Sequence, residues 1–422
     1  MTRCAIINSM IPSDVCYKGK DLCLEYRLVQ FYFSTRRKNI MKKILAIVLA
    51  ALMIAGCCVA FSSCKGNDGT IKIGLSGPLT DSAAVYGKGV ANAAQMAIDE
   101  INEKGGLNGI KFELKVMDDV NDKTKVQNNY AALVDWGMQI SLGCVTTQPA
   151  LEFKTLSATD DIFFMTPSAS ADAVRSEANG YQMCFADKKQ GVAAANYVNG
   201  LGLSKIGVFY QSDIDYSKGI YQEFRNNLSG SITVVEASFT NQTKTDFTQQ
   251  VSLLKDCEFI FMPIYYQEAS LFMTMAKDEA GIKTYYGCDG LDGLDTVLDL
   301  STIPQAITML THFKADANDY AKTFVANYTA KYGTDTLNQF GASAYDCVYA
   351  IFGALKKAVE AGKTVDASTS ASEMCDILKN QFNGGYEYTG AVTGGTEGKV
   401  KWTADGFVNK EAQVHVLKEA NS

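Results

Sequence analysis

The chain has 422 residues, enough for two or three domains, and its 47% hydrophobic and 20% charged residues are typical of a globular protein. This composition excludes a wholly disordered chain, a collagen-like fibre and a coiled coil. The net charge of −7 argues against a nucleic-acid-binding protein, which usually carries a basic face, and two histidines are too few for a histidine-rich metal site.

The first 64 residues differ in character from the rest of the chain. They carry a net charge of +6 and six of the twelve cysteines, whereas the remainder carries −13. Two lysines follow Met41, and residues 44–61 are then apolar and uncharged, which is the order of a secretory signal peptide. We therefore interpret residues 1–40 as an upstream extension and residues 41–64 as a signal segment that starts at Met41. A membrane-spanning helix preceded by a cytoplasmic segment is the alternative, because about 18 apolar residues suffice for a short span.

Two cysteines near the end of the apolar run stand in a context that resembles a bacterial lipobox. Cys57 follows the small residues Ala55 and Gly56, and Cys64 follows two serines. In a lipobox the cysteine receives a lipid and becomes the mature N-terminus. The resemblance predicts lipidation at Cys57, with Cys64 as the alternative, and a soluble domain tethered to the outer face of a membrane.

From residue 70 onward, strand patterns alternate with helix patterns. This alternation predicts parallel sheets with helices on both faces, and two runs of about 120 residues predict two doubly wound α/β lobes. Apolar residues at helical spacing predict helices over 90–101, 123–136, 149 onward, 191–199, 218–227, 246–255, 268–279, 318–331 and 342–361. Short apolar or alternating runs predict strands over 71–75, 110–116, 139–142, 162–165, 206–210, 232–237, 259–263, 284–286, 398–402 and 413–417.

Two polar turns follow consecutive predicted strands, where an open parallel sheet binds its ligands. In residues 143–149, Thr147 or Gln148 suits a helix cap and Pro149 the first helical position. Such a helix start offers free N–H groups and a hydroxyl to a carboxylate or phosphate. Residues 166–170 form a similar turn, and the two turns would converge. Taken alone, the first turn is better explained as an ordinary N-cap without a ligand.

A third loop, at residues 287–292, places Asp289 among glycines, where an acid can reach a cationic group of a ligand. An Asx-turn is the alternative for an Asp-Gly pair. A calcium site is less favoured, because the acids at 289, 292 and 295 lack the alternating spacing of an EF-hand loop. Aromatic residues near these loops could together line an apolar pocket, although each one by itself is better explained by packing in the core. They are Tyr86, Tyr216, Tyr265, Tyr266 and Phe340.

Taken together, these stretches resemble the extracytoplasmic solute-binding proteins of branched-chain amino acid ABC importers, over roughly 350 residues from Thr70 onward. The residues that carry the resemblance are 73–80, 85–87, 97–109, 117–119, 143–147 and 166–170. The resemblance implies a type I periplasmic-binding fold, in which three crossovers join two α/β lobes. The crossovers are expected near 186–188, 310–313 and 390–398. Lobe 1 would comprise residues 65–187 and 312–390, and lobe 2 residues 188–311 and 391–422.

By the same resemblance, an amino acid would lie between the lobes. Its carboxylate would meet the hydroxyl and N–H groups of Thr147 and Ser170, and its ammonium the carbonyl of Ser168 and the carboxylate of Asp289. Cys144, Tyr266 and Cys288 depart from the family pattern and leave the side-chain preference open. The full set of expected ligand-binding residues is Tyr86, Thr147, Gln148, Ser168, Ala169, Ser170, Tyr216, Tyr265, Asp289 and Phe340.

The sequence thus predicts a binding protein and not an enzyme. It would capture a branched-chain or otherwise apolar amino acid outside the cytoplasm, while anchored by its lipid, and deliver it to the permease subunits of an ABC importer. No cofactor, metal ion or nucleic acid is expected. A sensor of the same fold for an amide or small peptide is the alternative. A dinucleotide-dependent enzyme is less favoured, because residues 74–77 do not supply the required G-x-G-x-x-G.

Overall fold

The computed structural model describes residues 69–175, 179–393 and 398–420, which fall within one compact unit, Asn67–Ser422. The predicted signal segment, with Cys57 and Cys64, lies outside the described residues. Across the described ranges, no helix is both long and apolar enough to cross a membrane.

The first sheet contains five parallel strands in the order β2-β1-β3-β4-β5. In strand β1 the side chains of Ile71, Ile73 and Leu75, on one face, are fully buried, and Gly74 and Ser76 on the other face are buried too, as expected for a parallel sheet with both faces covered. We call the part of the chain built on this sheet lobe 1. The strands span Thr70–Gly77 (β1), Lys111–Asp118 (β2), Ile140–Cys144 (β3), Phe164–Thr166 (β4) and Gly180–Gln182 (β5).

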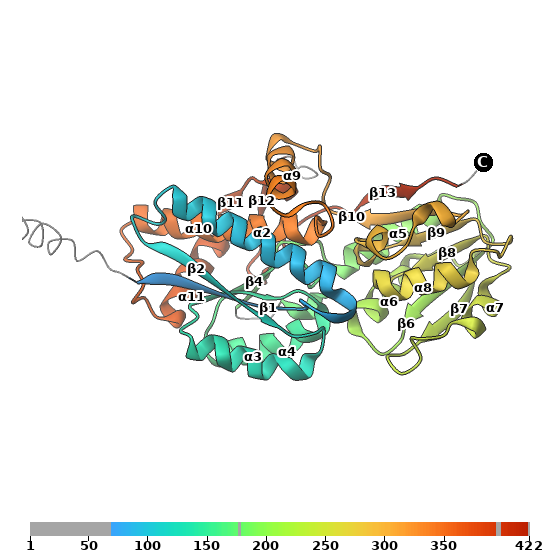
Figure 1. The fold of residues 1–422 in the computed structure, drawn as a ribbon, viewed down its shortest axis with the longest axis horizontal. Helices are drawn as coiled ribbons and strands as arrows, with labels where there is room; N and C mark the ends of the chain where they lie inside the picture. Colours follow the sequence, from blue (N-terminus) through green and yellow to red (C-terminus); the bar gives the residue numbers. More distant parts are fainter. Residues whose placement is uncertain (1–68, 176–178, 394–397, 421–422) are drawn as a thin grey trace, which may run out of the picture. The chain divides into compact units, whose positions relative to one another are not determined.

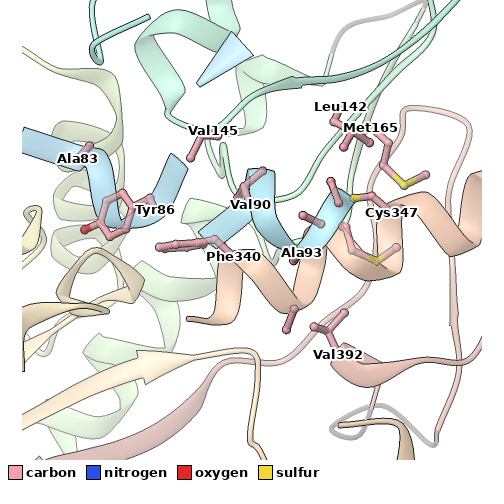
Figure 2. Close-up of a cluster of buried hydrophobic side chains, with 14 of the residues drawn as sticks. Ala83, Tyr86, Val90, Ala93, Leu142, Val145, Met165, Phe340, Cys347 and Val392 are labelled. Atoms are coloured by element: carbon pink, nitrogen blue, oxygen red, sulfur yellow. The ribbon is translucent and has the colours of Figure 1, made fainter. Parts of the chain in front are cut away.

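Helices cover both faces of the first sheet (Figure 1). Helices α2 and α10 pack along each other on one face, where their apolar side chains contribute to the cluster drawn in Figure 2 together with Leu142 of β3 and Met165 of β4. Helix α2 begins so close to the loop after β1 that a Cβ atom on Gly87 would lie 1.8 Å from the carbonyl oxygen of Pro78. The opposite face carries α3 and α4. These helices span Ala84–Glu103 (α2), Lys123–Asp135 (α3), Thr147–Thr159 (α4) and Gln339–Glu360 (α10).

The second sheet has the order β13-β10-β9-β8-β6-β7 and is parallel except for β13, which pairs antiparallel with β10. We call the part built on it lobe 2. Helices α5 and α6 cover one face, and α7 and α8 the other. The elements span Asp187–Asn199 (α5), Lys205–Gln211 (β6), Asp215–Asn227 (α6), Thr233–Phe239 (β7), Thr248–Leu254 (α7), Phe259–Met262 (β8), Tyr266–Ala276 (α8), Thr284–Gly287 (β9), Ala306–Thr311 (β10) and Gln413–Lys418 (β13).

The chain passes between the two sheets three times. The first two passages lie at residues 183–186, before α5, and at 312–318, between β10 and α9 (Asp319–Tyr332), close to the expected positions. The expectation that the third passage lies at 390–398 is wrong. Strand β11 (Glu387–Tyr388) pairs with β12 (Val400–Lys401), and Trp402 Nε1 donates to the Gln182 carbonyl of lobe 1 at 2.7 Å.

Residues 391–393 and 398–408 therefore stay with lobe 1, and the third passage follows them. The physical reason is that the indole of Trp402 is buried against Phe382, with ring centroids 4.8 Å apart. Phe382 belongs to helix α11 (Ala371–Asn383), which the sequence analysis missed although Ser370 and Glu373 form a complete capping box at its start. Strands β5, β10 and β11 were missed as well.

A buried carboxylate ties the segment after β11 to helix α10. Asp346 is fully buried and accepts hydrogen bonds from the Tyr388 hydroxyl at 2.8 Å and from the amides of Ala391 and Val392 at 3.0 and 2.7 Å. This one side chain thus satisfies three buried donors from a segment with little regular structure.

We expect Asp346→Ala to lower the free energy of unfolding by about 3 kcal/mol or more, because three buried donors lose their acceptor at about 1–3 kcal/mol each. Urea denaturation followed by circular dichroism measures the change. Asp319→Ala is the matched control: the Asp319 side chain is 99% exposed, so a change within about 0.5 kcal/mol is expected. Equal effects of the two substitutions would contradict this role for Asp346.

Candidate functional site

A small cavity with an empty volume of about 240 Å³ lies where loops of the two lobes meet. The loops follow β3, β4, β6, β8 and β9, so the cavity lies beyond the carboxyl ends of parallel strands. Eight of the ten predicted ligand-binding residues line it, the exceptions being Gln148 and Ala169. The complete lining is Tyr86, Val145, Thr146, Thr147, Ser168, Ser170, Tyr216, Tyr265, Asp289, Gly290 and Phe340.

The start of helix α4 forms one end of the cavity. Thr146, in an extended conformation, is the N-cap residue, so the expectation that Thr147 or Gln148 caps the helix with Pro149 in first position is wrong. Thr147 is the first helical residue, and its buried Oγ1 has no hydrogen-bond partner. A free hydroxyl beside the unpaired N–H groups of a helix start favours a negatively charged ligand group.

The turn after β4 is held in place by hydrogen bonds to lobe 1. The Ser168 hydroxyl donates to the Val145 carbonyl at 2.5 Å, which joins this turn to the one before α4. The Ala169 carbonyl accepts from Gln182 Nε2 at 2.8 Å, so Ala169 lies behind the cavity wall and not on it. Ser168 therefore offers the cavity its backbone, whereas its hydroxyl is already engaged.

Asp289 forms the opposite end of the cavity and is only 1% exposed. Its Oδ1 accepts from the Tyr216 hydroxyl at 2.7 Å, and its amide donates to Gln190 Oε1 at 3.0 Å. The Leu291 amide, which an Asx-turn would use, donates to the Cys288 carbonyl at 3.0 Å instead, so the Asx-turn alternative is wrong. Burial raises the pKa of Asp289 to about 6.

The loop that carries Asp289 approaches its neighbours too closely for any residue but glycine at position 290. A Cβ atom on Gly290 would lie 2.4 Å from the Ile264 carbonyl oxygen and 2.7 Å from the Tyr216 hydroxyl oxygen. The Gly290 amide donates to that hydroxyl at 2.9 Å. The predicted glycine-rich character of the loop therefore has a steric cause at this position.

Aromatic rings form the wall between the two ends. Tyr86 lies edge-to-face with Phe340, Tyr266 and Tyr265, at centroid distances of 4.8, 5.0 and 5.8 Å, and Tyr216 stacks on Tyr265 at 4.8 Å. Tyr86 and Phe340 come from the first turns of α2 and α10, and they face each other in Figure 2. The Tyr86 hydroxyl also donates to the Gly290 carbonyl at 2.5 Å, a direct bond between the lobes.

Some predicted residues lie elsewhere, and some lining residues were not predicted. Gln148 lines a wider cleft of about 1100 Å³, next to Tyr265. Cys144 and Cys288 are buried behind the cavity. Thr146, Val145 and Gly290 line it but were not predicted, although each directly adjoins a predicted residue or turn. In the part of the chain that the structure describes, no group of three acids, cysteines or histidines could hold a metal ion.

Because burial raises the pKa of Asp289 to about 6, folding takes up a proton at this carboxyl between pH 4 and 6, and stability falls as pH rises through that window. The pKa values of Asp119 and Asp292 are also raised to about 6 by burial. We expect the free energy of unfolding of the ligand-free protein to fall between pH 5 and pH 7. In Asp289→Asn this fall should be smaller by about 1 kcal/mol, because the variant lacks the titrating carboxyl. Urea denaturation at the two pH values measures this. An unchanged pH dependence in the variant would contradict the raised pKa of Asp289.

Known proteins share sequence and fold with this chain. A Leu/Ile/Val-binding protein from Rhizobium johnstonii is 27% identical over 368 residues, covering 86% of this chain and 99% of that protein. The branched-chain amino acid transporter substrate binding protein of Streptococcus pneumoniae, in complex with isoleucine, has a TM-score of 0.71 at 24% identity and covers 83% of this chain and 98% of that one.

A solute binding protein of an ABC transporter from Rhodopseudomonas palustris, in complex with 3,4-dihydroxybenzoic acid, has a TM-score of 0.70 at 18% identity, covering 83% of this chain and 94% of that one. At these identities the two solved structures show a shared fold. A family model described as periplasmic binding protein matches residues 70–402. This family model covers more than half of the chain, and the two α/β lobes of the structure agree with it. The chain therefore belongs to the periplasmic binding protein family.

Proposed function

We propose that this protein is an extracytoplasmic solute-binding protein that captures an apolar amino acid, branched-chain first, and presents it to the permease of an ABC importer. One observation carries the proposal: the cavity sets an unpaired hydroxyl at a helix start against a buried carboxylate, with aromatic rings between them. The names of the relatives in Rhizobium johnstonii and Streptococcus pneumoniae support a branched-chain ligand.

The polar groups of the cavity match an amino-acid zwitterion. The ligand carboxylate lies at the start of α4, where it accepts from the Thr147 hydroxyl and from free amides, with Ser170 beside it. The ammonium lies at the other end, between the Ser168 carbonyl and the Asp289 carboxylate. The aliphatic side chain packs against Tyr86 and Phe340. None of the eleven lining residues is basic, so the helix start and hydroxyls must hold the carboxylate.

Both lobes contribute to the cavity, so ligand binding would draw them together about the three crossovers. The cavity is small, which argues against a peptide as its ligand. The permease would then recognise the surface that the two lobes present together when they enclose the ligand.

Asp289→Ala would leave the buried ammonium unpaired, which typically costs about 3–5 kcal/mol. At about 1.4 kcal/mol per tenfold, the affinity for leucine, isoleucine or valine should fall by roughly two to three and a half orders of magnitude in titration calorimetry. Thr147→Ala should cost less, about 1.5–3 kcal/mol, because the backbone amides of the helix start remain.

Asp81→Asn is the control, since Asp81 is an exposed acid of the wider cleft and does not line the cavity. A change under about threefold for Asp289→Ala would show that Asp289 is not the ammonium partner. A thermal-shift screen of the twenty amino acids and 3,4-dihydroxybenzoate first identifies the ligand, since a bound ligand stabilises the folded state. Stabilisation by the aromatic acid alone would overturn the proposed ligand class.

We also propose that the protein is anchored by a lipid on Cys57, or alternatively Cys64, because both cysteines follow a signal-like apolar run. Metabolic labelling with an alkyne fatty acid should label the wild-type protein in the membrane fraction. Cys57→Ala should abolish the label and release the protein. Loss of label only in Cys64→Ala would assign the alternative cysteine, and an unlabelled wild-type protein would rule out the anchor.

A further inference from the structure

Asp187, the first residue of α5, is a buried acid that the function proposed above does not use. It directly follows the first crossover and is 4% exposed. Its amide donates to the Ser170 carbonyl at 2.9 Å, which fixes it against a cavity-lining residue of lobe 1. Gln190 Nε2 lies 3.5 Å from its Oδ1, but its Oδ2 is buried and has no hydrogen-bond partner.

The free oxygen belongs to a carboxylate that interacts with the residues of the cavity. Burial is the main reason why the pKa values of the Tyr265 and Tyr216 hydroxyls are raised, and the negative charge of Asp187 adds to the rise. Burial likewise raises the pKa of Asp187, and hydrogen bonding by the Ser170 hydroxyl opposes that rise. These three neighbours all line the cavity. Asp187 therefore lies close to the ligand space, although its own side chain is not part of the lining.

Gln190 links Asp187 to Asp289. Its Oε1 accepts from the Asp289 amide at 3.0 Å, and its Nε2 points to the Asp187 carboxylate. Two acids are thus buried in one network, beside a cavity that no basic side chain lines. Burying two like charges together is unfavourable unless they share a proton or a cation arrives.

We propose that Asp187 is a second carboxylate for the ligand ammonium and that the Asp187–Asp289 pair selects ligands with a positively charged nitrogen over simple carboxylates. This inference rests on the proposed function. An ammonium group has three N–H donors and needs three acceptors. The Ser168 carbonyl and Asp289 would provide two. In this proposal the third acceptor is the unpartnered Oδ2 of Asp187, which lies just outside the lining of the empty cavity.

The pair gives a physical reason for discrimination within this fold. One protein of the fold was solved with isoleucine and another with 3,4-dihydroxybenzoic acid, which has a carboxyl group but no ammonium. A ligand with a carboxyl group but no ammonium would leave both aspartates buried without a counter-charge. An amino acid supplies that counter-charge with the same group that satisfies the three acceptors.

Ligand binding should also displace a proton from the pair. Burial and the neighbouring Asp289 raise the pKa of Asp187 above its usual value. We therefore expect the two buried acids to share a proton in the empty site, and we expect the arriving ammonium to displace that proton to the buffer. The groups that face Asp187 are Asp289, Asp172, Tyr216, Tyr265, Cys184 and Cys288. Calorimetry in two buffers of different ionisation enthalpy counts the protons released.

The test compares leucine with 4-methylpentanoate, which is leucine without its ammonium, in the wild-type protein and in Asp187→Asn. The variant should bind leucine at least about tenfold more weakly and release fewer protons, while its affinity for 4-methylpentanoate stays the same or increases. Asp172→Asn, which neutralises an exposed acid near Asp187 outside the cavity, should leave both affinities within about threefold.

Equal weakening of both ligands in Asp187→Asn would overturn the inference, because a purely structural role affects both alike. An unchanged affinity for leucine would also overturn it and leave the proposed function intact. A wild-type protein that binds no amino acid would instead overturn the proposed function, and this inference with it. If Asp187→Asn does not fold, Asp187→Ser carries the same expectations.

Discussion

A buried carboxylate without a positive partner is the constraint on which the site depends. Asp289 lies 1% exposed beside a cavity that no basic side chain lines, and its charge is opposed by burial. The protein compensates in part with neutral donors, above all the Tyr216 hydroxyl at 2.7 Å. Hydrogen bonds from neutral groups reduce the free-energy cost of burying an ionised acid but do not remove it. A site of this kind is completed by a cation, and an amino acid carries one.

The same constraint explains the position of the surrounding residues. Tyr216 must reach Asp289 and the Gly290 amide together, which requires a residue without a side chain at position 290. The Gly290 carbonyl in turn accepts from Tyr86 of lobe 1. The acid, the glycine and the aromatic wall therefore form one connected unit, and a change in any of them would disturb the others.

Two of the polar contacts that join the lobes near the cavity come from one loop of lobe 2. One is the Tyr86–Gly290 bond, and in the other the Gln339 amide at the start of α10 donates to Asp292 Oδ2 at 2.9 Å. Both bonds use residues of the loop after β9, which also holds Asp289. The loop that would sense the ammonium is thus one of the segments that contact lobe 1, which couples occupancy of the site to the relative position of the lobes.

The sequence by itself determined the elements and the loops that carry the site. Alternating strand and helix periodicity is a local signal, so the parallel α/β lobes could be predicted, and Thr147, Ser168, Ser170 and Asp289 could be singled out from the turns after strands. Periodicity does not report which distant segments pack together, and three features depended on that.

The tertiary structure alone decided these three features. The third crossover was displaced by the hydrogen bond between Trp402 and Gln182, which are 220 residues apart. Gln148 lines the wider cleft, and the helix begins two residues earlier than its sequence suggested. In the sequence, Asp187 resembles an ordinary acid in the first turn of a helix. Only the structure shows that it is buried in one network with Asp289. Such residues acquire a functional role through burial and through contacts with residues far away in the sequence. Both depend on how distant segments pack together, and local sequence patterns carry no information about that packing.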